Sequence, residues 1–173
     1  MSYHRIRSSP FLTAVWVAAL TLILAFAGCA GNVQTTATGG VGGRVGDIVV
    51  RDAQLTFDGP IAGDTAYQPG DNAAVQLTVV NEGDGADRLI RVTSPVAQSA
   101  TITGNARIPG HQTLTAGYQA PLASTTPPGT DTVRIVLTDL LVPVRVGFSY
   151  PVVLAFEQAG ELRLELPVGN PPL

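Results

Sequence analysis

The chain has 173 residues, of which 13% are charged, about half the usual share. It contains 19 Gly and 13 Pro, a composition typical of turn-rich strands rather than of long helices. From residue 29 onward there are eight Arg against thirteen Asp and Glu, a net charge of −5. The basic residues form no patch, which argues against nucleic-acid binding.

The first 28 residues have the pattern of a signal peptide. A short positive region precedes the apolar run FLTAVWVAALTLILAFAG, residues 11–28. Cys29 follows directly, and Ala27-Gly28-Cys29 resembles a lipobox, the site at which a Cys is acylated and becomes the new N-terminus. The Leu that usually stands three residues before that Cys is Phe26 here.

Cys29 is the single cysteine of the chain, so it cannot form an intramolecular disulfide. An unmodified Cys29 would be a reactive thiol in an exported protein. We therefore predict export through the general secretory route, cleavage after residue 28 and a diacylglyceryl-type anchor on Cys29 at the outer face of the cytoplasmic membrane. The alternative is an uncleaved transmembrane anchor, since about 20 apolar residues span a bilayer.

Residues 29–46 are expected to hold the lipidated Cys and a flexible tether. Residues 30–46 contain six Gly and almost no large apolar side chain. Such a segment buries too little apolar surface to offset the entropy of ordering, and as Gly-rich coil it reaches about 20–25 Å. The folded domain is predicted over residues 47–168, followed by a short C-terminal tail at 169–173.

Short β-strands are predicted throughout residues 47–168. Alternation is clearest in AAVQLTVV (73–80) and in ELRLELPV (161–168), where apolar side chains share one face of each strand. No window has a sustained 3.6-residue period, so no long helix is expected. The other expected strands are 48–57, 88–93, 100–103, 111–117, 132–140 and 151–157. This pattern predicts an all-β fold, a β-sandwich or a barrel of seven or eight short strands.

Three segments resemble the periplasmic copper chaperone family PCu(A)C. They are NEGDGADRLIRVTSPVA (81–97), IPG (108–110) and FEQAGELRLELPV (156–168). The N-terminal architecture is similar to that of the LpqE-type lipoproteins of mycobacteria, a subgroup of that family. The resemblance implies a cupredoxin-like (immunoglobulin-like) antiparallel β-sandwich in which His and Met side chains bind Cu(I).

The copper-binding positions of that family fall near Thr103, Arg134 and Val136, and none of the three is a His or a Met. After cleavage, the mature chain keeps His111, no Met, and the acylated Cys29. Cu(I) prefers thiolate, thioether or imidazole ligands, and one imidazole does not complete such a site. The resemblance therefore implies the fold, whereas the residues argue against the copper chemistry, and we predict no bound cofactor.

Two other metal sites stay open as alternatives. Glu82, Asp84 and Asp87 lie in a Gly-rich turn whose oxygen atoms could bind Ca²⁺, although the EF-hand spacing is absent and Asp87 fits a structural pair with Arg88. His111 could hold a metal shared across a dimer. As a catalytic base it would need a nucleophile that no motif supplies, and a surface turn histidine is the simpler interpretation.

The leading hypothesis is a non-enzymatic binding or scaffolding module for an envelope protein or a cell-wall component. Metal handling through His111 or the loop 81–87 is the alternative, and an enzyme is the least favoured class. Four aromatic residues near the strand ends could form a partner or glycan surface if exposed together, although scattered residues at the edge of the core are the simpler interpretation. These residues are Tyr67, Tyr118, Phe148 and Tyr150.

Overall fold

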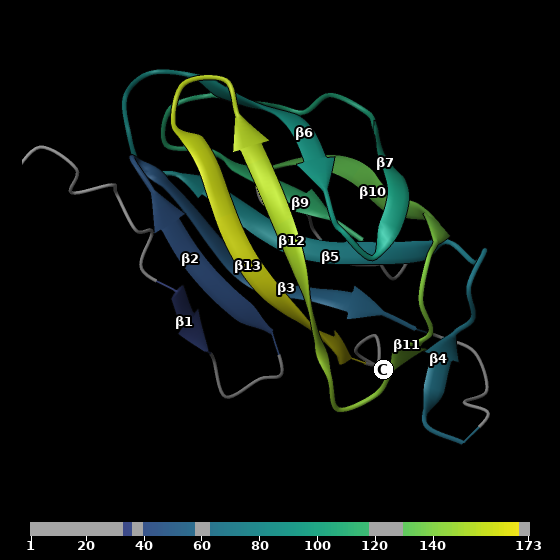
Figure 1. Cartoon of the computed structure of the whole chain (residues 1–173). Helices are drawn as coiled ribbons and strands as arrows, with labels where there is room; N and C mark the ends of the chain where they lie inside the picture. Colours follow the sequence, from purple (N-terminus) through teal and green to yellow (C-terminus); the bar gives the residue numbers. More distant parts are fainter. Residues whose placement is uncertain (1–32, 36–39, 58–62, 118–129, 170–173) are drawn as a thin grey trace, which may run out of the picture. The chain divides into compact units, whose positions relative to one another are not determined.

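The computed structural model describes residues 33–35, 40–57, 63–117 and 130–169. These residues form β-strands and the turns between them, without any helix (Figure 1), so the predicted all-β class is confirmed. Consistent with this, the described part of the chain holds no helix that could cross a membrane. The predicted signal peptide, Cys29 and the last four residues lie outside the described residues.

Each of the eight predicted strands is present, with ends that differ by three residues or fewer. These strands are β3 (Ile48–Thr56), β5 (Ala73–Asn81), β6 (Asp87–Thr93), β7 (Ala97–Thr103), β9 (Thr113–Ala116), β10 (Thr130–Leu140), β12 (Ser149–Phe156) and β13 (Gly160–Gly169). The described residues form five more strands, each of two to five residues, which is too short for alternation to reveal. They are β1 (Val33–Thr35), β2 (Val41–Val45), β4 (Thr65–Tyr67), β8 (Arg107–Ile108) and β11 (Val144–Arg145).

Eleven of these strands form one continuous sheet, and β4 pairs with β11 in a separate ribbon. The order in the sheet is β7-β10-β9-β5-β3-β13-β12-β6-β8, and β2 and β1 add to β3. β13 joins β3 through a short parallel contact at Val168↔Leu55 and Gly169↔Thr56. The sheet curls at this contact, so β12 and β13 cross over β5 and β3 (Figure 1).

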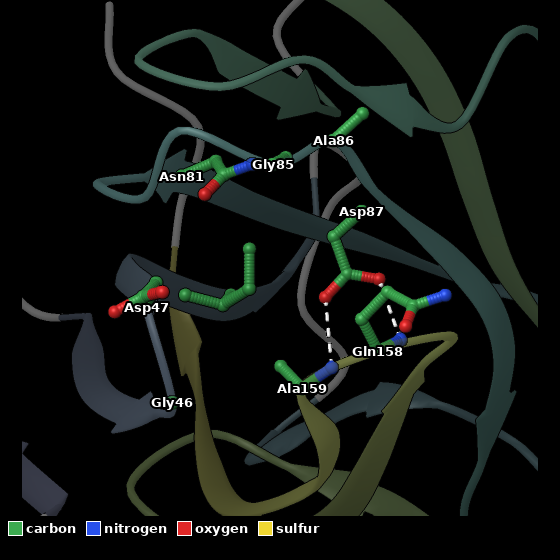
Figure 2. A pocket seen from close by; sticks show the side chains of 9 residues that line it. Gly46, Asp47, Asn81, Gly85, Ala86, Asp87, Gln158 and Ala159 are labelled. Atoms are coloured by element: carbon green, nitrogen blue, oxygen red, sulfur yellow. Dashed lines mark hydrogen bonds between the residues drawn. The ribbon is translucent and has the colours of Figure 1, made fainter.

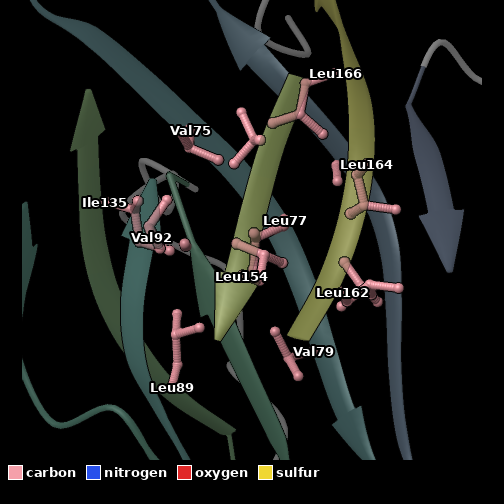
Figure 3. Packing of buried hydrophobic residues seen from close by; sticks show 14 of the residues in the cluster. Val75, Leu77, Val79, Leu89, Val92, Ile135, Leu154, Leu162, Leu164 and Leu166 are labelled. Carbon is pink, nitrogen blue, oxygen red and sulfur yellow. The ribbon is translucent and has the colours of Figure 1, made fainter. Parts of the chain in front are cut away.

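The core lies between the two halves of the curled sheet. Leu162, Leu164 and Leu166 of β13 are at most 2% exposed, and they belong to one hydrophobic cluster with the buried side chains of β5 (Figure 3). The side chains between these leucines face solvent, as the two-residue period of a strand requires. Burying a Leu or Val side chain stabilises the folded state by about 1.5–3 kcal/mol, so this alternation is the main energetic reason for the fold.

Two strands lie within residues 29–46, where the sequence predicts a flexible tether: β1 and, next to the core, β2. β2 pairs with β3 through Arg44↔Val49 and Val45↔Ile48, and Val41 is 7% exposed. A Cβ atom on Gly43 would lie 3.0 Å from a methyl group of Leu164, so the glycine lets the backbone of β2 pack directly on the leucines of β13. The glycine-rich composition predicts a flexible linker. In the folded domain, the missing side chain of Gly43 instead allows the backbone of β2 to pack closely on β13.

Candidate functional site

The three positions predicted to correspond to the family's copper ligands lie on the outer face of the sheet, on the paired strands β7 and β10. β10 pairs antiparallel with β7, and the register places Arg134 opposite Thr103 and Val136 opposite Thr101. Val133, Ile135 and Leu137 of β10 are buried in the core. Because side chains alternate along a strand, Arg134 and Val136 point away from the core, next to Thr103. The structure therefore brings together three residues that lie up to 33 positions apart in the sequence.

These three side chains offer no soft donor for a metal ion. They present a guanidinium, a hydroxyl and an isopropyl group, and Arg134 and Thr103 are exposed. A guanidinium stays protonated and has no lone pair to donate, so it repels a cation at this position. The described part of the chain contains no group of three His, Cys, Asp or Glu side chains with metal-binding geometry.

Asp87 is a structural residue in the folded domain. Its side chain is 6% exposed and accepts three backbone N–H groups, from Arg88 at 2.7 Å and from Gln158 and Ala159 at 2.9 Å each. Figure 2 shows the carboxylate pointing at the turn that joins β12 to β13. Since all three bonds are to its two oxygen atoms, Asp87 fastens that turn to the start of β6 and is not available to a metal ion.

The other polar residues of the loop point to different partners. Glu82 pairs with Arg44 and lies 4.0 Å from Arg51, which ties the loop to strands β2 and β3. Asn81 is 2% exposed and closes the loop, because its side-chain N–H groups donate to the carbonyl oxygens of Gly85 and Ile108. Of the residues considered as an alternative calcium site, Glu82 and Asp87 thus bond to the protein itself.

His111 lies beside this loop and contacts Asp84. Its Nε2 atom is 2.8 Å from a carboxylate oxygen of Asp84, and both side chains are largely exposed. His111 also adopts the left-handed conformation with φ of 58°, and its N–H donates to the carbonyl oxygen of Gly83. The sequence did not predict this contact, since 27 positions separate His111 from Asp84. Two donors on exposed loops do not make a metal site by themselves.

A shallow pocket of about 510 Å³ lies beside the same loop (Figure 2). Its polar lining includes the side chains of Asp47, Asn81 and Asp87, and the last two already have protein partners. The pocket holds neither a histidine nor a nucleophilic side chain. Its geometry therefore assigns no reaction to this end of the domain.

The described aromatic residues near the strand ends are not exposed together. Tyr67 packs edge-on against Phe57, with ring centroids 5.1 Å apart, and its hydroxyl donates to the carbonyl oxygen of Thr56. Tyr150 is half-buried, whereas Phe148 is largely exposed. Tyr118 lies outside the described residues. Tyr67 and Tyr150 therefore lie at the edge of the core, as the simpler interpretation expects. Phe148 is the one of the three that faces solvent.

Comparison with known proteins identifies the family. A family model described as "Putative lipoprotein LpqE-like" matches residues 45–168. The chain belongs to the LpqE-like family. Relatives named "Putative lipoprotein LpqE" from Mycobacterium bovis and Mycobacterium tuberculosis are 29% identical over 162 residues, which cover 88% of this chain and 87% of theirs.

Solved structures similar to this LpqE-like chain are PCuAC domains. A copper-bound PCuAC domain from PmoF2 is 27% identical with a TM-score of 0.53, and the match covers 75% of this chain and 98% of that one. An apo PCuAC domain from PmoF1 is 25% identical with a TM-score of 0.55, covering 75% and 99%. The predicted resemblance to LpqE-type members of the PCu(A)C family is confirmed.

Proposed function

We propose that this LpqE-like protein is a lipid-anchored, non-enzymatic binding or scaffolding module of the cell envelope, on a cupredoxin-like sandwich that does not bind copper. Cys29 carries a diacylglyceryl-type anchor and holds the domain at the outer face of the cytoplasmic membrane. The printed name of the relatives supports the anchor, because it describes them as lipoproteins. The PCuAC neighbours support the sandwich, although the described strands form a single curled sheet.

One observation carries the loss of copper binding. The register of β7 and β10 places a permanently charged guanidinium, Arg134, directly opposite Thr103, where the resemblance expects His and Met ligands. These side chains disfavour a cation on the PCuAC-like fold, which supports the proposal. Metal handling through His111 is not proposed, because Nε2 is already engaged by Asp84 and no third donor lies nearby in the described residues.

Direct titration tests this proposal. The chain from residue 30 onward, which lacks the Cys29 thiol, is titrated with Cu(I) against a chromophoric chelator under anaerobic conditions. We expect no binding tighter than micromolar, since no described residue pair offers soft ligands. Tight binding of one Cu(I) per monomer would refute the proposal.

Restoring the ligands provides the positive test. The triple variant T103H/R134H/V136M places two imidazoles and a thioether on adjacent strands, and we expect it to gain Cu(I) affinity by at least tenfold. The matched control is S99H/T138H. Residues 99 and 138 are directly paired on the same two strands, so this variant gains two imidazoles away from the predicted ligand positions. Equal affinity in the two variants would show that the site is not special to positions 103, 134 and 136.

A further inference from the structure

Four large apolar side chains stand exposed in one short segment between β10 and β12. Leu141 and Phe148 are 58% exposed and Val142 and Val146 are 40% exposed; we call residues 141–148 the apolar loop. Among the described residues, one other large apolar side chain is exposed to this degree, Ile90 on β6 at 55%. Apolar side chains that gather on one loop mark a contact surface, whereas single ones are common on any protein.

The apolar loop is held in a fixed shape by its own backbone. Val144 is fully buried in the middle of the loop, and β11 pairs there with β4. The N–H of Arg145 donates to the hydroxyl of Tyr150 at 2.7 Å, and the N–H of Val146 donates to the carbonyl oxygen of Asp64 at 2.8 Å. With the centre of the loop fixed in this way, the apolar side chains on both sides of Val144 are displayed to solvent without further ordering. A partner therefore meets a preorganised surface.

The chain that precedes the domain indicates which partner is nearest. The apolar run of residues 11–28 ends at Cys29, and Val33 is the first residue of β1, where it pairs with Gly43 of β2. Four residues reach at most about 14 Å, so under the proposed anchoring the bilayer surface lies within about that distance of Val33. The bilayer is then present at the domain at a high effective concentration, without any recruitment step.

The chemistry of the apolar loop fits the interfacial region of a bilayer. Leu, Val and Phe side chains enter the boundary between headgroups and acyl chains, and a neighbouring long basic side chain keeps its charge in the headgroup layer. Arg145 supplies that side chain: it lies between the two apolar halves of the loop, is about half exposed, and is 3.7 Å from Asp64. We propose that the apolar loop is a second membrane contact, inserted into the bilayer in which Cys29 is anchored; this inference rests on the proposed anchoring.

A single tryptophan can report this contact. The one Trp of the chain, Trp16, precedes Cys29, so the mature protein has none. In the lipidated protein reconstituted into phosphatidylcholine–phosphatidylglycerol vesicles, Phe148→Trp should emit at shorter wavelength than the same variant without vesicles. Lipids brominated along their acyl chains should quench at least half of that emission, because bromine quenches on contact.

The matched control is Ile90→Trp, which places the same probe at an equally exposed apolar position on a strand. We expect bromine quenching of this probe below a tenth. Equal quenching at both positions, or none at position 148, would overturn the inference. A blue shift at position 148 that grows with protein density and resists bromine would assign the loop to a second copy of the chain, and would also overturn it.

The same samples separate this inference from the proposed function. Mass spectrometry of the N-terminal peptide reports whether Cys29 carries the lipid. If the Phe148→Trp protein is lipidated and bound to vesicles but its emission is not quenched, the anchor stands and the loop contact is rejected. An unlipidated Cys29 rejects the anchoring and, with it, the inference that rests on it.

Discussion

Asp87 shows how one side chain joins two segments that are distant in the sequence. Its carboxylate accepts N–H groups from β6 and from the turn between β12 and β13, which are 71 and 72 positions away in the sequence. Sequence reasoning recognised the aspartate within a family motif, and expected either a calcium ligand or a pair with Arg88. The sequence did not predict the N–H groups of Gln158 and Ala159 as partners, because every residue other than proline has a backbone N–H group and the side-chain pattern does not show which ones lie near Asp87.

We predict that Asp87→Asn lowers the free energy of unfolding by about 2 kcal/mol. The amide has one acceptor oxygen in place of two, so at least one buried N–H loses its partner, and hydrogen bonds to a charged acceptor are the stronger ones. Urea denaturation followed by circular dichroism measures the change. Asp84→Asn is the control, since that side chain is fully exposed and its replacement should leave the urea midpoint unchanged. Equal effects of the two variants would contradict the structural role of Asp87.

At the three candidate ligand positions, the sequence gives the residue types but not their spatial arrangement. The types of residues at 103, 134 and 136 are read directly from the sequence, so the absence of His and Met there needed no structure. From the sequence, only the family resemblance suggested that these residues are neighbours. The register of β7 and β10 shows that they are. Residue identity is local information, whereas adjacency between strands is not.

At the scale of elements, β2 is the segment for which composition gave the wrong expectation. Glycine in a linker and glycine at a close contact look the same in sequence, because both lack a side chain. The contact of Gly43 with Leu162 and Leu164 distinguishes them. The long alternating strands were predicted correctly, since each buries an apolar row that the sequence displays by itself.

We therefore expect Gly43→Val to destabilise the domain by about 1–3 kcal/mol. The new side chain would have to displace the leucine methyl groups that lie 3.0–3.1 Å from its Cβ position. Arg44→Val, the next residue of the same strand, faces solvent and loses one exposed ion pair, so it should cost less than about 1 kcal/mol. Chemical denaturation of both variants tests the difference. If Gly43→Val were as stable as Arg44→Val, the close packing of residue 43 against β13 would be contradicted, and residues 41–45 would be better described as a linker.

For the whole molecule, the sheet begins before the predicted boundary at residue 47, because β2 pairs with β3 and β1 pairs with β2. A chain that begins at residue 47 lacks β2, with its buried Val41 and its cover over the leucines of β13. We predict that it is less stable than the chain from residue 30 by about 3 kcal/mol or more, the scale expected for losing one buried side chain and exposing parts of others. A chain from residue 40 keeps β2 and should stay within about 1 kcal/mol of the longer one, because surface changes away from the core cost little. Thermal unfolding of the three chains decides where the domain begins.

Composition, hydrophobic period and a few local motifs determined the fold class, eight strand positions and the family of this protein. They could do so because each of these properties is written in residues that are adjacent or evenly spaced. The tertiary structure alone decided that β2 belongs to the sheet, that Asp87 holds the turn between β12 and β13, and that residues 141–148 display their apolar side chains. Those outcomes depend on which backbone atoms meet across the curled sheet, and free energies of contact between distant segments are not encoded in any single stretch of sequence.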